Sequence, residues 1–269
     1  MRSCIIALGL LTLLGSSRAG AAGNKAVAII WKGAKTQADA EAKMVSWGDL
    51  GKVLEKTGLK LKDDQPKLVQ SKTVPGLKPG FWVWLLGVCA PDEATPIVEH
   101  FKLLSPETYS REVKVPAKKQ SCPQREGAAL EAREESFKLP SGETLRVFTR
   151  EEREEDAEEE EGKWNHGSLT RYHFVLFGKD GEVLGATDAV GEEDVDKSAG
   201  DGPTAYRCDV TSLEASKEGT FILTRSCHAR AGECGALMSA DEVVTVKVNG
   251  SAVSASAPKR QNPQYAECD

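Results

Sequence analysis

The pattern of apolar positions between residues 24 and 116 predicts strands and helices that alternate along the chain. Residues 26–31 (AVAIIW) and 81–89 (FWVWLLGVC) are nearly continuous apolar runs, which is typical of buried strands. Shorter runs at 67–72 and 109–115 predict two further strands. Two helical segments fall between these strands, so the expected order is β-α-β-β-α-β.

The two helical segments have the period of amphipathic helices. Apolar side chains recur on one face of residues 38–56, but two glycines close to Trp47 predict a kink or break there. Gly58 follows this segment, where a helix C-cap favours a residue with positive φ. The second helix is predicted to begin at Pro91, because proline suits the first turn of a helix.

The second half of the chain, residues 128–269, predicts strands and no clear helix. Asp180-Gly181 and Asn249-Gly250 are dipeptides typical of tight β-hairpin turns. Runs that predict strands lie at 145–149, 168–177, 182–190, 206–210, 221–225, 244–248 and 251–256. The expected fold class is therefore α+β, with a β-α-β-β-α-β module followed by a mainly antiparallel β domain, either one sheet or a small sandwich.

Charge changes sign between the two halves. Residues 24–126 carry 17 Lys and Arg against 12 Asp and Glu, whereas residues 127–269 carry 16 against 29. This shift marks a compositional boundary, and the polar segment 117–127 is the expected linker between domains at 24–116 and 128–269. The whole chain has a net charge of −6, which excludes a nucleic-acid binder held by phosphate neutralisation.

Residues 1–22 have the features of a signal peptide. Met1-Arg2 supplies a positive start, and residues 5–14 form an apolar run that is too short to span a hydrocarbon layer of roughly 30 Å. Small residues at 16–23 suit cleavage by signal peptidase. No other run reaches the length of about eighteen apolar residues that a membrane helix needs. We therefore expect an exported protein, periplasmic or secreted, with no transmembrane segment in the mature chain.

Export changes how the cysteines are interpreted. Cys4 lies in the signal, which leaves an even number of cysteines, and an even number in an exported protein favours disulfides. The six are Cys89, Cys122, Cys208, Cys227, Cys234 and Cys268. The domain division favours pairing Cys89 with Cys122, and proximity favours Cys227 with Cys234, which leaves Cys208 with Cys268. A metal site at Cys227, His228 and Cys234 is not favoured, since a structural zinc site needs a fourth ligand.

The sequence lacks the common catalytic motifs. It contains no P-loop, dinucleotide fingerprint, His-Glu-x-x-His pair or Gly-x-Ser-x-Gly elbow. The histidines, His100, His166, His173 and His228, are scattered along the chain. We therefore assign no catalytic residue, no metal and no cofactor, and a hydrolase of the envelope is the least favoured function.

An acidic run occupies residues 151–161 (EEREEDAEEEE), with nine carboxylates in eleven positions. Blocks of like charge are usually solvated loops or frayed helices, and this is the interpretation we favour. The alternative is an acidic arm that binds a cation or a partner.

Residues 75–94 carry a resemblance to a known family. The stretch Pro75-Gly76-Leu77-Lys78-Pro79-Gly80-Phe81-Trp82-Val83-Trp84-Leu85-Leu86-Gly87, followed by a helix with Asp92-Glu93-Ala94, resembles the second half of a SPOR (sporulation-related repeat) domain. Residues 26–31 and the helix that follows them look like the first half. The resemblance covers about residues 25–116 and implies a ferredoxin-like fold for this module. No family is recognised for the C-terminal part.

The resemblance implies a cell-wall ligand. SPOR domains bind septal peptidoglycan with polar and aromatic side chains on the open face of their sheet. Alternation places Trp82 and Trp84 on one side of their strand, and Phe81, Val83 and Leu85 on the other. If Trp82 and Trp84 face outward they are candidates for stacking on sugar rings, and if they face the helices they belong to the core.

These observations favour an exported, non-enzymatic cell-envelope protein. The basic SPOR-like module would bind peptidoglycan, and the acidic β domain would contact an envelope protein. The alternative is a secreted protein-interaction or inhibitor module with no glycan binding.

Overall fold

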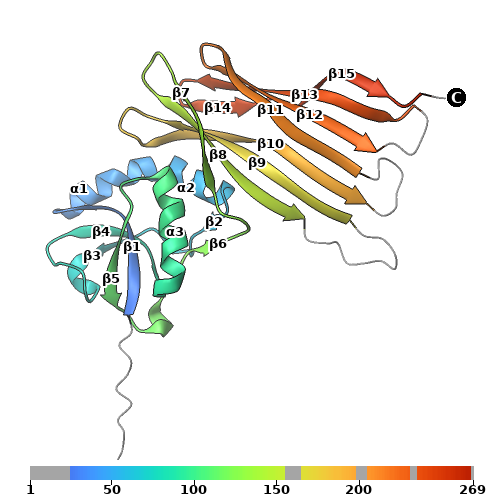
Figure 1. Ribbon diagram of the computed structural model, residues 1–269. Coiled ribbons are helices and arrows are strands. Elements are labelled where there is room, and N and C mark those ends of the chain that lie inside the picture. Colours follow the sequence, from blue (N-terminus) through green and yellow to red (C-terminus); the bar gives the residue numbers. More distant parts are fainter. Residues whose placement is uncertain (1–24, 155–164, 198–204, 231–234, 268–269) are drawn as a thin grey trace, which may run out of the picture.

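The computed structural model describes residues 25–154, 165–197, 205–230 and 235–267. Antiparallel strands make up most of it and helices are few, as expected for an α+β chain. A four-stranded sheet with three α-helices forms an N-terminal domain, and a nine-stranded sheet forms a β domain (Figure 1). The predicted signal peptide at residues 1–22 lies outside the described residues.

The sheet of the N-terminal domain has the strand order β3-β4-β1-β5, and all its neighbouring strands are antiparallel. Its strands are β1 (Lys25–Ala34), β3 (Lys67–Gln70), β4 (Trp82–Cys89) and β5 (Tyr109–Lys114). The two central strands, β1 and β4, are the nearly continuous apolar runs of the sequence. Both of their faces are covered by other parts of the chain, which explains why polar residues do not alternate in them.

Helices cover one face of this sheet. They are α1 (Gln37–Ala42), α2 (Trp47–Lys56) and α3 (Pro91–Leu104). A 3-10 turn at Lys43–Ser46 separates α1 from α2, which confirms the predicted break near Trp47. Gly58 has a φ of 84°, which confirms the predicted C-cap conformation.

The segment after β5 is tied to the N-terminal domain. It contains a 3-10 turn at Ala117–Lys119 and the short strand β6 (Gln124–Arg125), which pairs with β2 (Leu59–Lys60). A disulfide joins Cys89 at the end of β4 to Cys122 in this segment, as predicted. The expected linker is therefore held against the first domain by backbone pairing and by a covalent bond.

The β domain is one sheet in which strands that follow each other in the sequence lie side by side. The order is β14-β13-β12-β11-β10-β9-β8-β7, and β15 also pairs with β13. The strands are β7 (Glu131–Lys138), β8 (Thr144–Glu154), β9 (Asn165–Phe177), β10 (Val183–Lys197), β11 (Ala205–Lys217), β12 (Thr220–Arg230), β13 (Leu237–Asn249), β14 (Ala252–Ala255) and β15 (Lys259–Tyr265). Gly181 and Gly250, both with positive φ, lie at the two predicted hairpin turns.

This sheet rolls over an apolar core of its own. The Phe137 ring on β7 lies 4.8 Å from the Phe221 ring on β12, although these strands are not neighbours in the sheet. The turn before β14 also folds back onto β10, where a Cβ on Gly185 would overlap the Ser251 carbonyl. The sequence allowed either one sheet or a small sandwich for this domain. The structure has the single sheet, which is rolled.

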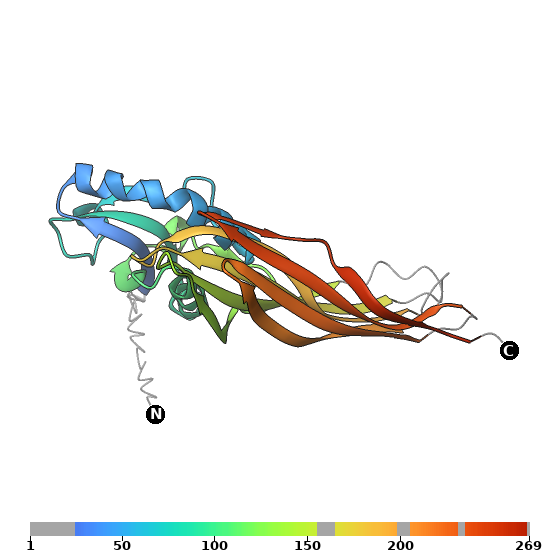
Figure 2. The same ribbon diagram turned by 90° about the horizontal axis from the view of Figure 1, so that it is seen from above.

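The two domains share a second apolar core. Phe148, Phe177 and Val183 of the β domain are buried in one cluster with side chains of α2 and α3. Figure 2 shows the β domain extending away from this junction as a long twisted sheet.

Four strands and one segment differ from the sequence-based expectation. β2 and β6 were not predicted, because each has only two residues. β7 and β15 were not predicted, because their exposed, charged sequences show no apolar face. The acidic run was expected to form a loop, but its first four residues, 151–154, continue β8. The remainder of the run, 155–161, lies outside the described residues.

Candidate functional site

The face of the N-terminal sheet opposite the helices is partly covered by the chain itself. Small side chains line this face, and the segment between β3 and β4 crosses it as a strap, residues 71–81. Val74 of the strap is buried against Ala28 and Val113. The Lys114 amide on β5 donates a hydrogen bond to the Pro75 carbonyl at 2.8 Å. The strap is thus anchored at the far edge of the sheet.

The rest of this face forms a groove of about 370 Å³. Its lining residues are Ile30, Ser71, Gly76, Leu77, Lys78, Phe81, Val83, Tyr109 and Arg111. The Arg111 guanidinium lies 4.8 Å from the centre of the Tyr109 ring. Burial raises the pKa of Tyr109, although Arg111 opposes this, so its phenol stays protonated and can donate a hydrogen bond. We call this region the sheet-face groove.

The composition of the sheet-face groove suits one type of ligand. Phe81 and Tyr109 offer aromatic surfaces, and Phe81 is 36% exposed. Lys78 and Arg111 add positive charge near those rings. Aromatic faces pack on the apolar faces of sugars, and a guanidinium binds carboxylates with strong hydrogen bonds. The groove therefore offers aromatic surface and positive charge to a ligand.

The two tryptophans proposed for glycan stacking lie elsewhere. Trp84 is 9% exposed and packs in the core under the helices, where its indole N–H donates to the Ala40 carbonyl at 2.7 Å. Trp82 is half-buried. Alternation does sort the side chains of residues 81–85 into two sets. The set that lines the groove, however, is the one with Phe81 and Val83, and not the one with the tryptophans. Trp84 is a core residue and is not free to stack on a sugar.

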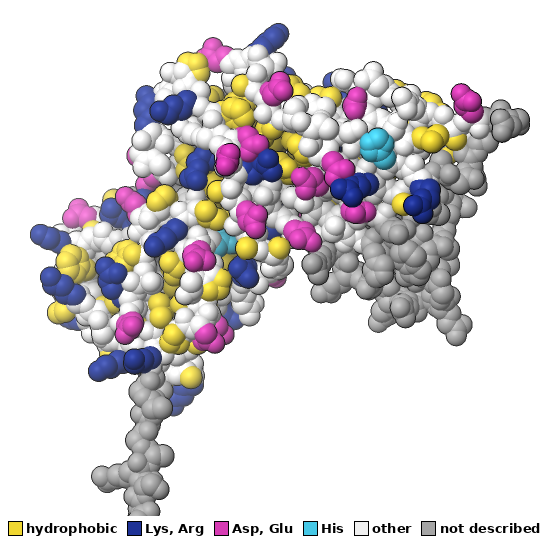
Figure 3. Space-filling model, viewed as in Figure 1, with side chains coloured by type: hydrophobic (Ala, Val, Ile, Leu, Met, Phe, Trp, Pro, Cys, Tyr) yellow, Lys and Arg dark blue, Asp and Glu magenta, His cyan; other side chains and the backbone are white. Residues whose placement is uncertain are grey.

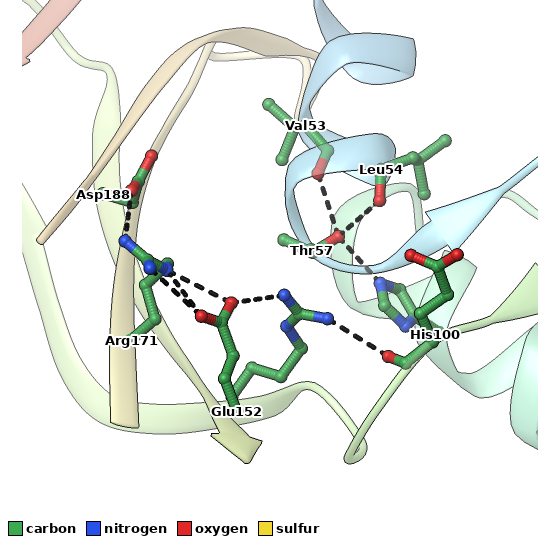
Figure 4. Close-up of polar contacts among 9 residues, drawn as sticks. Val53, Leu54, Thr57, His100, Glu152, Arg171 and Asp188 are labelled. Atoms are coloured by element: carbon green, nitrogen blue, oxygen red, sulfur yellow. Dashed lines mark hydrogen bonds and ion pairs between the residues drawn. The ribbon is translucent and has the colours of Figure 1, made fainter. Parts of the chain in front are cut away.

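A second polar cluster lies where the two domains meet (Figure 4). Arg171 on β9 forms ion pairs with Glu152 at 3.0 Å and with Asp188 at 3.0 Å. Lys56 at the end of α2 reaches across the junction to Asp188 at 3.2 Å. Arg150 pairs with Glu152 and donates to the Glu126 carbonyl at 3.1 Å. We call these residues the junction network. In the view of Figure 3, acidic and basic side chains are interspersed over the surface where the two lobes meet.

The junction network also lowers the pKa values of two carboxyl groups. The pKa of Glu152 lies below its usual range, because Arg171 and Arg150 outweigh the desolvation that raises it. The pKa of Asp188 is lowered in the same way by Lys56 and Arg171. A further interdomain ion pair joins Lys32 on β1 to Glu182 in the β9–β10 hairpin. These contacts stabilise the placement of the domains. They were not predicted, because most of these residues lie far from their partners in the sequence; the exception is Arg150, which pairs with Glu152 two positions along the same strand.

One disulfide in the β domain corrects the predicted pairing. Cys227 is bonded to Cys208, not to Cys234, and Cys208 is therefore not bonded to Cys268. Cys208 and Cys227 lie directly opposite each other on β11 and β12, with Cα atoms 4.0 Å apart. Strand register brings them together more closely than their sequence separation suggested. Cys234 and Cys268 lie outside the described residues.

A buried ion pair lies beside this disulfide. Arg225 on β12 donates to Glu242 on β13 at 2.6 Å, and both side chains are 6% exposed. Glu242 also approaches Cys208 and Cys227 closely enough for the three to form a metal-ligand set. The two sulfurs are bonded to each other, and Arg225 and Arg260 hold the carboxylate, so these atoms are occupied.

Comparisons with known proteins give no match. In the described part of the chain, no helix is long and apolar enough to cross a membrane. No protein-family model matches the sequence, and no curated protein or solved structure is significantly similar to it.

Proposed function

We propose that this protein is an exported, non-enzymatic component of the bacterial cell envelope that binds peptidoglycan through the sheet-face groove. The observation that carries this proposal is the groove itself. It combines Phe81 and Tyr109 with the cationic side chains of Lys78 and Arg111. Glycan strands of peptidoglycan present sugar rings, and where the stem peptides have been removed they also present free lactyl carboxylates, which are the groups that such a groove can hold.

The strand arrangement supports a SPOR-like, ferredoxin-like assignment of the N-terminal domain. Its elements follow the order β-α-β-β-α-β, with the helices on one face and the groove on the other. The groove therefore lies on the side of the sheet that the SPOR resemblance assigns to the ligand. Because the strap at residues 71–81 covers part of this face, the groove has room for only a short segment of a glycan strand.

The cysteines support export. Two disulfides occur in the described part of the chain, and disulfides persist in oxidising compartments. The acidic β domain then remains available for a protein partner of the envelope. The alternative is a secreted interaction module that binds no glycan, and the experiment must distinguish it from the proposed function.

Co-sedimentation with purified peptidoglycan sacculi at low salt tests the proposal, using residues 24–269. We expect the wild-type chain to sediment with the sacculi. Tyr109→Ala and Arg111→Ala should each raise the dissociation constant, obtained by varying the amount of sacculi, by about tenfold, which corresponds to a loss of roughly 1.4 kcal/mol of binding free energy. Arg207→Ala, which removes the same charge from the exposed surface of the β domain, should bind as wild type does. Equal retention of all four proteins, or no retention of wild type, contradicts glycan binding at the groove.

A further inference from the structure

A buried histidine lies on each side of the domain junction. His100 lies on α3 of the N-terminal domain and is 3% exposed. His173 lies on β9 of the β domain and is 2% exposed. Desolvation is the largest cause that lowers the pKa of His100, and the charges of Arg125, Arg150 and His173 lower it further.

The hydrogen bonds of Thr57 fix the proton on His100. The Thr57 hydroxyl lies 2.9 Å from the Val53 carbonyl and 3.0 Å from the Leu54 carbonyl, and it donates its one hydrogen to them. The contact between Thr57 Oγ1 and His100 Nε2, at 2.9 Å, must then be donated by the ring (Figure 4). Neutral His100 therefore carries its proton on Nε2, and its Nδ1 is a bare acceptor.

Each histidine has one ring nitrogen without a hydrogen-bond partner in the described residues. These atoms are Nδ1 of His100 and Nε2 of His173. A bare acceptor costs little, but a proton on His100 Nδ1 would bury a donor and a positive charge together. The neutral forms of the rings therefore fit the closed junction, and the charged form of His100 does not.

The charged groups around the rings come from every element packed at the junction. Basic side chains face them from α2, β6, β8 and β9: Lys56, Arg125, Arg150 and Arg171. Acidic side chains face them from β8 and β10: Glu152 and Asp188. Asp188 and Glu152 favour the charged form of His173, but desolvation outweighs them, and Arg150 and Arg171 oppose them.

The direction of the pH effect follows from these surroundings. Desolvation is the largest cause, and it lowers the pKa of both histidines from 6.5 to about 4. The contribution of the two neutral histidines to the stability of the junction is therefore fully present above pH 6.5, and it is lost as the pH falls toward 4. Between pH 7 and pH 5, each histidine shifts the closed-to-open equilibrium by roughly 20-fold toward the open form. Glu152 and Asp188 keep their charge in this range, because their pKa values are lowered.

We propose that His100 and His173 form an acid-sensitive clasp, in which proton uptake loosens the junction while each domain keeps its own fold. Each domain has features that allow this. The N-terminal domain has its own disulfide, and the rolled sheet has its own core and disulfide. The proposal does not depend on the ligand of the sheet-face groove.

Small-angle scattering of the intact mature chain from pH 7.5 to pH 4 tests this, with far-UV circular dichroism on the same samples. We expect the radius of gyration to rise between pH 6 and pH 4.5 while the dichroism spectrum is unchanged. The double variant His100→Gln/His173→Gln, which takes up no proton at these positions, should stay compact to a pH at least about one unit lower. His228→Gln, an exposed control on β12, should follow wild type.

Titration of the histidine ring signals by NMR in the wild-type chain gives a second measurement that needs no variant. Two histidines that titrate below pH 5, together with the expansion, support the clasp. Titration of His100 and His173 near pH 6.5, no expansion above pH 4, or an equal midpoint in the double variant would overturn it.

Discussion

The guanidinium of Arg150 occupies the space that any side chain at Gly58 would need. A Cβ at position 58 would overlap Nη1 of Arg150 and would lie 2.8 Å from the Glu126 carbonyl. Arg150 belongs to the β domain, and Gly58 directly follows the C-cap residue of α2 in the N-terminal domain. A cation at the C-terminal end of a helix is also favoured by the helix dipole. The end of one helix is therefore shaped to receive the other domain.

Gly58→Ala should destabilise the protein by about 2 kcal/mol, because alanine at φ 84° is strained and its methyl group displaces Arg150. Gly48→Ala is the matched control, since Gly48 lies in α2 with nothing within 4 Å of the added methyl group. That change should stabilise the chain by about 0.5–1 kcal/mol. Denaturant unfolding at pH 7 measures both. If Gly58→Ala left the free energy of unfolding unchanged, Arg150 would not pack against position 58.

Trp84→Phe should cost about 1–2 kcal/mol, because the buried Ala40 carbonyl loses the indole donor and keeps only the Lys43 amide, and because a buried side chain becomes smaller. Trp82→Phe should cost less, since Trp82 is half-buried. Neither substitution should change the fraction of protein that sediments with peptidoglycan. A selective loss of glycan binding in a stable Trp84→Phe chain would return the ligand site to the tryptophans.

Non-reducing peptide mapping should yield one peptide pair joined by Cys208 and Cys227 and another joined by Cys89 and Cys122. Mass spectrometry of a protease digest gives this result directly. A pair joined by Cys227 and Cys234 would instead restore the pairing suggested by sequence proximity.

Glu242→Gln should destabilise the protein by roughly 3 kcal/mol, because it removes the nearer and more buried counter-ion of Arg225 and leaves only Glu193, at 3.2 Å. The double variant Arg225→Met/Glu242→Leu should be more stable than Glu242→Gln, since no unpaired charge remains between these strands. Arg207→Ala breaks an exposed ion pair with Asp209 and should cost less than about 1 kcal/mol. Equal effects of the buried and the exposed changes would argue against the burial of Arg225.

Local sequence patterns predicted the elements of the N-terminal domain well, because its strands and helices bury strongly apolar residues. The break near Trp47, the C-cap at Gly58 and the hairpin turn at Gly181 each depend on residues that are close in the sequence. β7 and β15 escaped prediction because edge strands need few apolar side chains.

The candidate site was harder to predict for a physical reason. Alternation separates Trp84 from Phe81, but it does not say which face the helices cover. The partners of Glu152 and the pairing of Cys208 with Cys227 depend on strand register, which is set by long-range packing. The strap is similar: its proline and glycine residues indicate a turn, yet its path across the sheet depends on contacts with β5.

Glycan binding at the sheet-face groove is most directly tested by NMR mapping on residues 24–269. Backbone amide signals would be followed while soluble, peptide-free glycan fragments are added. The account predicts saturable shifts at Phe81, Tyr109 and Arg111, with the β domain unaffected. The account would be contradicted by changes in amide signals that are confined to the β domain, or by no changes at millimolar concentrations of the fragments.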